Sequence, residues 1–187
     1  MDGTFFITLD YLKQLGACRD GQREFQRVFP DGGKYQDVLD RCAEESRVDF
    51  GIWLLNHIGA TDDVRIYKED INNPNRVIIF AGNIKFESKV NIKALYSARG
   101  IEASWGIEAG CGIEAGEGIE AGWGIKAGKG IEAGWGIEAG EGIEAGKDFC
   151  VFAGLKVRKS RWEFDAVVTA KTKPDNLVSG FWKPLEV

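Results

Sequence analysis

The chain has 187 residues, a formal net charge of −5 and four cysteines. It contains no apolar run near the eighteen residues that a membrane-spanning helix needs, and it opens with no charged-then-apolar leader. The cysteines form no Cys-x-x-Cys pair, so we expect reduced thiols in a cytoplasmic protein without a membrane partner.

The charge is unevenly distributed along the chain. Residues 1–75 carry a net charge of −5, residues 76–100 carry +4, residues 101–146 carry −7 and residues 147–187 carry +3. An acidic segment between two basic ones indicates a charged binding surface, although a solvated face gives the same pattern.

Residues 1–62 have the pattern of a small helical domain. Thr8 can cap a helix that runs to Gly16, and further helices are predicted over residues 22–28, 35–45 and 50–58. Gly59 follows as a C-cap. About sixty residues make a marginal core, so we expect this domain to dock on the segment that follows.

The next residues, 63–76, are polar and rich in turn formers, and they predict a linker. Strand character begins at Val77. We therefore expect a β-solenoid over residues 77–158, in which residues 77–100 form irregular first coils.

Residues 101–146 contain eight copies of a six-residue unit. Each copy begins with Ile and has Ala two positions later. A Gly-x-Gly segment follows in the first seven copies, in which Ser104 once replaces the first Gly, and the eighth copy ends the array at Gly146. Residues two apart share a face of a strand, so Ile and Ala point inward while the residue between them points outward. Stacked coils bury Ile against Ile, which a single short strand cannot do.

Three units make one coil of eighteen residues. The sequence therefore predicts a mainly β fold, a three-sided parallel β-solenoid of six-residue repeats behind an α-helical domain. The hand of the solenoid stays open. Continuing the period places Phe149 and Leu155 inward, and residues 159–187 predict a β-rich cap over the last sheet edge, with strands that include residues 162–164, 166–169 and 177–182.

The outward position of the repeat is Glu in seven copies and Lys126 in one. An eighteen-residue coil places these side chains in three columns: Glu102, Glu120 and Glu138; Glu114 and Glu132; and Glu108, Lys126 and Glu144. Carboxylates about 4.8 Å apart repel by roughly 0.9 kcal/mol in water. The ladder either keeps solenoids apart in solution or imitates the phosphate row of a nucleic acid.

The fifth position of the repeat varies and holds three tryptophans. Trp105 and Trp123 lie one coil apart, and Trp135 lies on a neighbouring corner. The flanking glycines predict that all three side chains are exposed. Three roles stay open: a seat for the helical domain, a contact with a protein partner or a second copy of the chain, and stacking on bases.

No catalytic constellation is evident in the sequence. His57 is the only histidine, and it lies beside apolar residues. The Gly-x-Gly runs lack the Gly-Lys-Ser/Thr of a phosphate loop. We therefore expect a non-enzymatic protein that uses no metal and no cofactor.

The Ile-Glu-Ala-Gly-x-Gly array, flanked by Val77-Ile-Ile-Phe-Ala-Gly82 and Val151-Phe-Ala-Gly154, resembles uncharacterised repeat proteins of phages and prophages. The segment Leu9-x-x-Leu-x-x-Leu-Gly-Ala-Cys18, with Phe29-Pro-Asp-Gly32, is similar to a helical module that precedes repeat arrays in such proteins. The repeat unit is also similar to strands of bactofilin-type solenoids. The resemblance implies an architecture and a host-cell cytoplasm, and it implies no activity.

Three functions follow from these features. The first is an anti-CRISPR or other anti-defence inhibitor whose Glu ladder and tryptophans occupy the basic surface of a host nucleic-acid-binding complex. The second is a self-assembling or virion-associated solenoid. The third is nucleic-acid binding through the basic C-terminal segment, which holds Lys156, Arg158, Lys159 and Arg161. A short acidic solenoid favours the first over the second.

Overall fold

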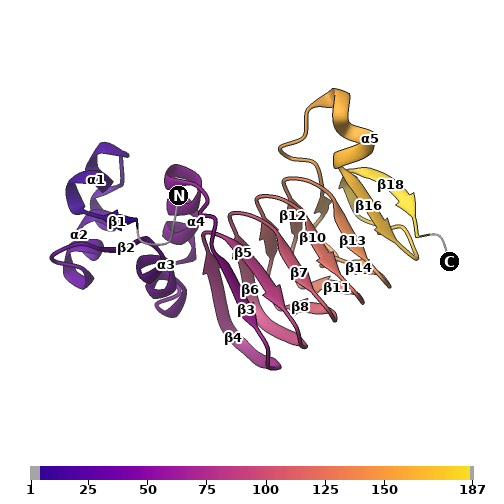
Figure 1. The fold of residues 1–187 in the computed structure, drawn as a ribbon, viewed down its shortest axis with the longest axis horizontal. Helices are drawn as coiled ribbons and strands as arrows, with labels where there is room; N and C mark the ends of the chain where they lie inside the picture. Colours follow the sequence, from indigo (N-terminus) through magenta and orange to yellow (C-terminus); the bar gives the residue numbers. More distant parts are fainter. Residues whose placement is uncertain (1–4, 186–187) are drawn as a thin grey trace.

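The structure is a computed structural model that describes residues 5–185. The chain forms a mainly β protein, in which parallel strands stack into a solenoid behind a group of N-terminal helices (Figure 1). The helices cover one end of the stack. A loop with a short helix projects near the other end.

The helical domain agrees closely with the sequence pattern. Its elements are β1 (Phe6–Ile7), α1 (Leu9–Gln14), α2 (Arg19–Val28), β2 (Gly33–Lys34), α3 (Tyr35–Glu44) and α4 (Val48–Ile58). The Thr8 hydroxyl accepts a hydrogen bond from the Tyr11 amide at 3.2 Å, which confirms the predicted cap. The second helix begins three residues earlier than predicted. Cys18 is its N-cap, and the Cys18 thiol accepts a hydrogen bond from the Gly21 amide.

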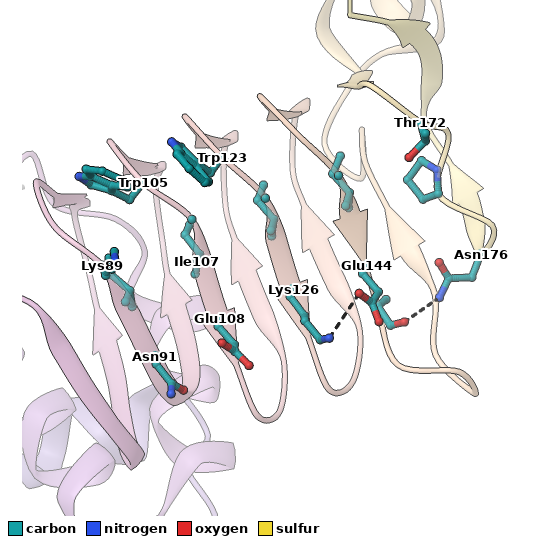
Figure 2. Close-up of a pocket in the computed structure, with 18 of the residues that line it drawn as sticks. Lys89, Asn91, Trp105, Ile107, Glu108, Trp123, Lys126, Glu144, Thr172 and Asn176 are labelled. Carbon is teal, nitrogen blue, oxygen red and sulfur yellow. Dashed lines mark hydrogen bonds and ion pairs between the residues drawn. The ribbon is translucent and has the colours of Figure 1, made fainter.

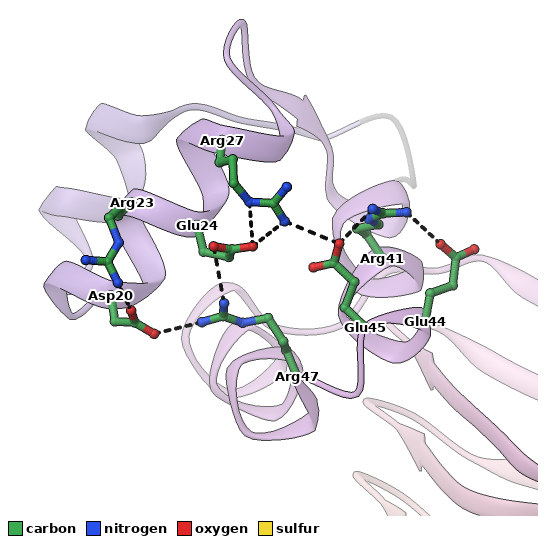
Figure 3. A network of polar contacts seen from close by, with 8 residues as sticks. All are labelled: Asp20, Arg23, Glu24, Arg27, Arg41, Glu44, Glu45 and Arg47. Carbon is green, nitrogen blue, oxygen red and sulfur yellow. Dashed lines mark hydrogen bonds and ion pairs between the residues drawn. The ribbon is translucent and has the colours of Figure 1, made fainter.

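Exposed charges join the helices to one another. Arg27 bonds Glu24 on its own helix and lies 3.4 Å from Glu45, and Arg47 lies 2.9 Å from Asp20 (Figure 3). The network alternates four arginines with four carboxylates: Asp20, Arg23, Glu24, Arg27, Arg41, Glu44, Glu45 and Arg47. Each exposed pair contributes about 0.2–1 kcal/mol, so the network supports the packing of the helices more than it determines it.

The repeat forms coils of eighteen residues, as predicted. Ile119 pairs in parallel with Ile101 in the coil before it and with Ile137 in the coil after it. The eight repeat isoleucines are buried, and with the repeat alanines they line one continuous core. Residues at the outward position point away from this core.

The strands stack in three columns. The first column is one sheet of seven strands: β3 (Val64–Tyr67), β5 (Asn83–Phe86), β7 (Ile101–Ala103), β10 (Ile119–Ala121), β13 (Ile137–Ala139), β16 (Val167–Ala170) and β18 (Phe181–Pro184). The second column holds β8 (Ile107–Ala109), β11 (Ile125–Ala127) and β14 (Ile143–Glu144). The third holds β9 (Ile113–Ala115), β12 (Ile131–Ala133), β15 (Val151–Phe152) and β17 (Leu177–Ser179). The second and third columns both begin at the long strand β6 (Val90–Ser97), which pairs with β8 and with β9. On its other side, β6 pairs with β4 (Ile71–Phe80).

The predicted linker at residues 63–76 is wrong, because this segment belongs to the solenoid. It contains β3 and the first half of β4, and these strands pair with β5 and β6. Arg65 occupies the register position that Ile84 and Ile101 hold in the next coils. A charged residue in place of the inward Ile hides the strand from a hydrophobic pattern. The solenoid strands thus run from Val64 to Pro184, beyond the expected bounds of 77–158.

The inward positions predicted for Phe149 and Leu155 are also wrong, since both side chains are exposed. Val151 takes the place of the inward Ile, twenty residues after its partner Ile131. Two extra residues therefore shift the period at this point. The predicted strand at 162–164 is instead α5 (Trp162–Asp165), which follows the short helix η1 (Lys159–Arg161), whereas the strand at 166–169 is confirmed as β16.

The helical domain covers the free edge of β4. The side-chain amide of Gln36 on α3 donates to the Ile79 carbonyl at 2.9 Å and accepts from the Ala81 amide at 3.1 Å. Arg65 forms two hydrogen bonds to the Asp40 carboxylate, at 2.8 and 2.9 Å. The two Gln36 bonds satisfy backbone groups at the edge that would otherwise offer a template for strand pairing.

Candidate functional site

The predicted carboxylates do not form one surface, because the three columns present them in different directions. Glu102, Glu120 and Glu138 lie in register on the first column. The second column places Lys126 between Glu108 and Glu144. The third column holds the register pair Glu114 and Glu132. Each column therefore has its own electrostatic character.

We call the first of these surfaces the acidic face. It surrounds a shallow hollow of about 490 Å³, and its charged lining consists of Lys85, Glu102, Glu117, Glu120, Glu138 and Asp165. Lys85 lies 2.6 Å from Glu102, and Arg99 lies 3.1 Å from Glu117. Within residues 5–185, Glu120 and Glu138 form no salt bridge. Negative charge without a direct ion pair therefore lies at the centre of this face, where Lys85 also attracts the Glu120 carboxylate.

Exposed apolar rings lie at the edge of the acidic face. Trp135 is 52% exposed and Phe164 is 70% exposed, and both line the same hollow. The exposure predicted for Trp135 is confirmed. Phe164 was not anticipated, because its segment was predicted to be a strand of the cap.

The second column forms a larger depression, which we call the Trp groove. Its volume is about 1240 Å³, and it runs from Asp70 to Asn176 across β6, β8, β11 and β14. Trp105 and Trp123 stand on one rim, with ring centroids 5.5 Å apart and planes tilted by 32° (Figure 2). The Lys89 ammonium lies 5.6 Å from the centre of the Trp105 ring.

A row of polar side chains lies below the two rings. It consists of Asn91, Glu108, Lys126 and Glu144 (Figure 2). Lys126 lies 3.4 Å from Glu144, and the Asn91 amide donates to the Asn72 side chain at 3.1 Å. Sequence reasoning missed Lys89, Asn91 and the C-terminal end of the groove, because their segments depart from the eighteen-residue period.

The third column is partly covered, and Glu114 and Glu132 line a small hollow of about 370 Å³. Residues of α4 and the Lys156 side chain lie around Glu114, which is half-buried. Burial and the neighbouring Glu132 carboxylate raise the pKa of Glu114, and Lys156 opposes this rise. Glu114 and Glu132 are therefore poor candidates for contact with a large partner.

The tryptophan pair does not seat the helical domain. The helices pack instead on β4 and β6, through a cluster that includes Val77, Ile79 and Ala94. Trp105 and Trp123 remain 40% and 56% exposed. Both rings are therefore accessible to a partner, a second copy of the chain or another ligand.

The four basic residues proposed for nucleic-acid binding are only partly available. Lys156 packs over Gly116 and Gly134 beside the third column. Arg161 is paired with Asp165 at 2.8 Å, and its guanidinium lies 5.4 Å from the Phe164 ring centre. Arg158 and Lys159 are exposed, as are Lys156 and Arg161.

His57 lies on the surface of α4, away from both depressions. Its ring stacks on Trp53 with a centroid distance of 4.1 Å, and its Nδ1 lies 2.8 Å from the Trp53 carbonyl oxygen. Across residues 5–185, three or more His, Cys, Asp or Glu side chains nowhere gather in a way that could hold a metal ion. None of the helices in this range has the length and apolarity to cross a membrane.

The fold and the two open surfaces define a β-solenoid protein with an N-terminal helical domain. Residues 1–60 match the family model of the YdhT N-terminal domain. No curated protein and no solved structure matches the chain significantly. The family match thus covers the helical domain, and the solenoid must be interpreted from its own geometry.

Proposed function

We propose that this protein is a non-catalytic interaction protein of phage or prophage origin whose acidic face occupies a basic surface on a host protein. The target is a nucleic-acid-binding complex, such as a defence nuclease, that the protein inhibits as an anti-CRISPR or related factor. The supporting observation is the unbroken register of Glu102, Glu120 and Glu138. The phage origin rests on the resemblance of the repeat array.

Charge complementarity is the physical basis of the proposal. Five carboxylates and one amine line the hollow of the acidic face among the described residues. Glu120 and its neighbours recur at the strand spacing of about 4.8 Å, so a partner can meet them with a row of Lys or Arg. Such complementarity increases the association rate and selects against acidic partners.

Trp135 and Phe164 complement this charge with apolar contact area. Interfaces usually depend on a few buried aromatic anchors surrounded by weaker polar contacts. Two exposed rings beside a charged hollow have this arrangement. By contrast, direct binding of DNA is disfavoured, because the acidic face repels phosphate and Arg161 is already paired.

Two double variants with the same change in net charge test the proposal. Glu120→Gln with Glu138→Gln alters the acidic face, and Glu108→Gln with Glu144→Gln alters the second column. Proteins captured from a bacterial lysate on each immobilised variant are identified by mass spectrometry. We expect nucleic-acid-binding proteins to bind the wild type and the second-column variant, and to be lost from the acidic-face variant.

The captured partner is then purified, and its DNA binding is measured with and without the protein. Inhibition by the wild type, with weaker inhibition as salt increases, supports the proposal. Equal capture by both double variants contradicts it. Larger assemblies of the acidic-face variant in sedimentation, without loss of any partner, would instead favour a self-assembling solenoid.

A further inference from the structure

We propose that the Trp groove binds an oligosaccharide, laid across the coils with its sugar rings against Trp105 and Trp123. This inference uses the second column, so it does not depend on the function proposed for the acidic face. The groove is an additional binding site, and its ligand class follows from three features of its lining.

The first feature is the pair of tryptophan rings. Trp105 and Trp123 occupy equivalent positions in successive coils, and both rings are open to solvent. Exposed apolar surface of this size on one rim indicates a binding site. A pyranose ring has a flat face of C–H groups, which packs on an aromatic face. Two successive rings of a sugar chain can therefore use the two platforms.

The second feature is the polar row beneath the rings. Asn91 can donate and accept hydrogen bonds, Lys126 donates, and Glu108 and Glu144 accept. Thr172 and Asn176 continue the polar lining at the far end. Sugar hydroxyl groups both donate and accept, so they can satisfy each member of such a mixed row. An apolar peptide would leave these groups desolvated and unpaired.

The third feature is the balance of charge. The charged residues that line the groove among the described part of the chain are four acids and four bases: Asp70, Glu108, Glu144 and Asp175, with Lys89, Lys126, Lys147 and Lys173. A polyanion or a polycation therefore gains no net attraction here. This balance contrasts with the acidic face and favours a ligand without net charge.

The size of the groove indicates a chain of several units. Its volume of about 1240 Å³ exceeds the range of about 300–1,000 Å³ that small-molecule pockets usually occupy. The groove also crosses successive coils, so the spacing of its lining positions repeats along its length. A polymer with a repeating unit fits such a surface better than a compact ligand does.

The tryptophans provide a matched pair of variants. Trp105→Ala with Trp123→Ala removes the platforms, and Trp135→Ala removes an equally exposed ring from the acidic face. Linear hexasaccharides of glucose and of N-acetylglucosamine serve as probes, with calorimetry as the readout. We expect a hexasaccharide to bind the wild type and Trp135→Ala alike, and to bind the double variant about tenfold more weakly or worse.

Chain length and the polar row provide second readouts. The matching disaccharide should bind more weakly than the hexasaccharide, and Glu108→Ala should weaken binding while leaving both rings in place. Failure of every hexasaccharide to bind would overturn the proposal, as would equal affinity of the wild type and the double variant. A dimer of the wild type that dissociates in the double variant would also overturn it, because the groove would then be an interface between copies.

Discussion

A Cβ atom on Gly140 would lie 2.0 Å from the carbonyl oxygen of Gly122 in the preceding coil. A Cβ atom on Gly142, two positions later, would have no atom within 4 Å. The two glycines of the repeat therefore have different roles. The first permits the close approach of successive coils, whereas the second is less crowded and, at Gly142, has room for a side chain.

Alanine substitutions should separate these roles. Gly140→Ala forces a methyl group against backbone, and we expect it to destabilise the protein by about 3 kcal/mol. Gly142→Ala should change the free energy of unfolding by less than about 0.5 kcal/mol. Denaturant unfolding measures both values, and equal midpoints for the two variants would contradict the assigned contact.

One residue of the repeat, Ser104, replaces the first glycine, and its location is consistent with the close approach of successive coils at that position. Ser104 lies where the coil beneath is one residue shorter, since Ile84 pairs with Ile101 and Val90 pairs with Ile107 at a spacing of seventeen. Gly110, in the same stretch, has its nearest carbonyl oxygen 3.9 Å away. The irregular coil leaves room for a side chain that the regular coils exclude.

The inward and outward positions of the repeat should respond oppositely to substitution. Ile119 is 0% exposed at the centre of the core, so Ile119→Ala should cost about 2–5 kcal/mol and Ile119→Glu should unfold the solenoid. Glu120→Gln should preserve or raise the midpoint, because it relieves repulsion with Glu102 and Glu138. Thermal unfolding followed by circular dichroism compares the variants. Similar losses for Ile119→Glu and Glu120→Gln would refute the assignment.

Glu114 should make stability depend on pH. Folding raises its pKa above the ordinary value of 4.5, so the folded chain retains the proton more strongly than the unfolded chain does. Stability is therefore lost as pH rises from that ordinary value through the raised pKa, and the loss persists at higher pH. Below this pH window Glu114 is protonated in both the folded and the unfolded state, so it does not reduce the stability of the folded state.

The variant Glu114→Gln removes the titrating group. We expect its melting temperature to exceed that of the wild type at neutral pH, and the difference to shrink as the pH falls below the ordinary glutamate value. Glu163→Gln, at an exposed position on α5, serves as the control and should show no such trend. A constant difference across the pH range would disprove the contribution of Glu114.

The contact between α3 and β4 should hold the helical domain on the solenoid. Gln36→Ala removes two hydrogen bonds to the edge of β4 and leaves the Ile79 carbonyl and Ala81 amide without this partner, at a cost of about 1–3 kcal/mol. Hydrogen exchange in β4 should increase in this variant. The exposed Gln26 provides a control, and Gln26→Ala should leave exchange in β4 unchanged. Unaltered exchange in Gln36→Ala would show that apolar packing alone seats the domain.

The regular part of the molecule could be predicted because one physical rule applies to every unit. Ile and Ala alternate with an outward residue, and the coil length, the register and the three columns follow. The irregular coils could not be predicted, because Arg65 occupies an inward register position whose partner, Asp40, comes from a distant helix. The two-residue shift before Val151 has no signal in the repeat itself.

The candidate surfaces, like the fold, could be predicted only where they follow the repeat. The stacking and exposure of Trp105 and Trp123 follow from the period, whereas the polar lining of the Trp groove includes Asn91 and Asn176, which lie outside it. The three columns of carboxylates also follow from the period, whereas the differences in charge and cover between the columns do not. The contacts of each column show these differences. The first column is open and acidic, the charges around the second are balanced, and the third is partly covered.

The coil of eighteen residues also constrains how the gene can change in length. A gain or loss of repeats that keeps the Ile-x-Ala pattern changes the chain by whole six-residue units. Loss of three units deletes one coil and leaves every later side chain on its own column. Loss of a single unit between Trp105 and Trp123 would instead move Trp123 and all later residues to another column and separate the two rings. Lineages that keep these surfaces should therefore differ in length by multiples of eighteen residues.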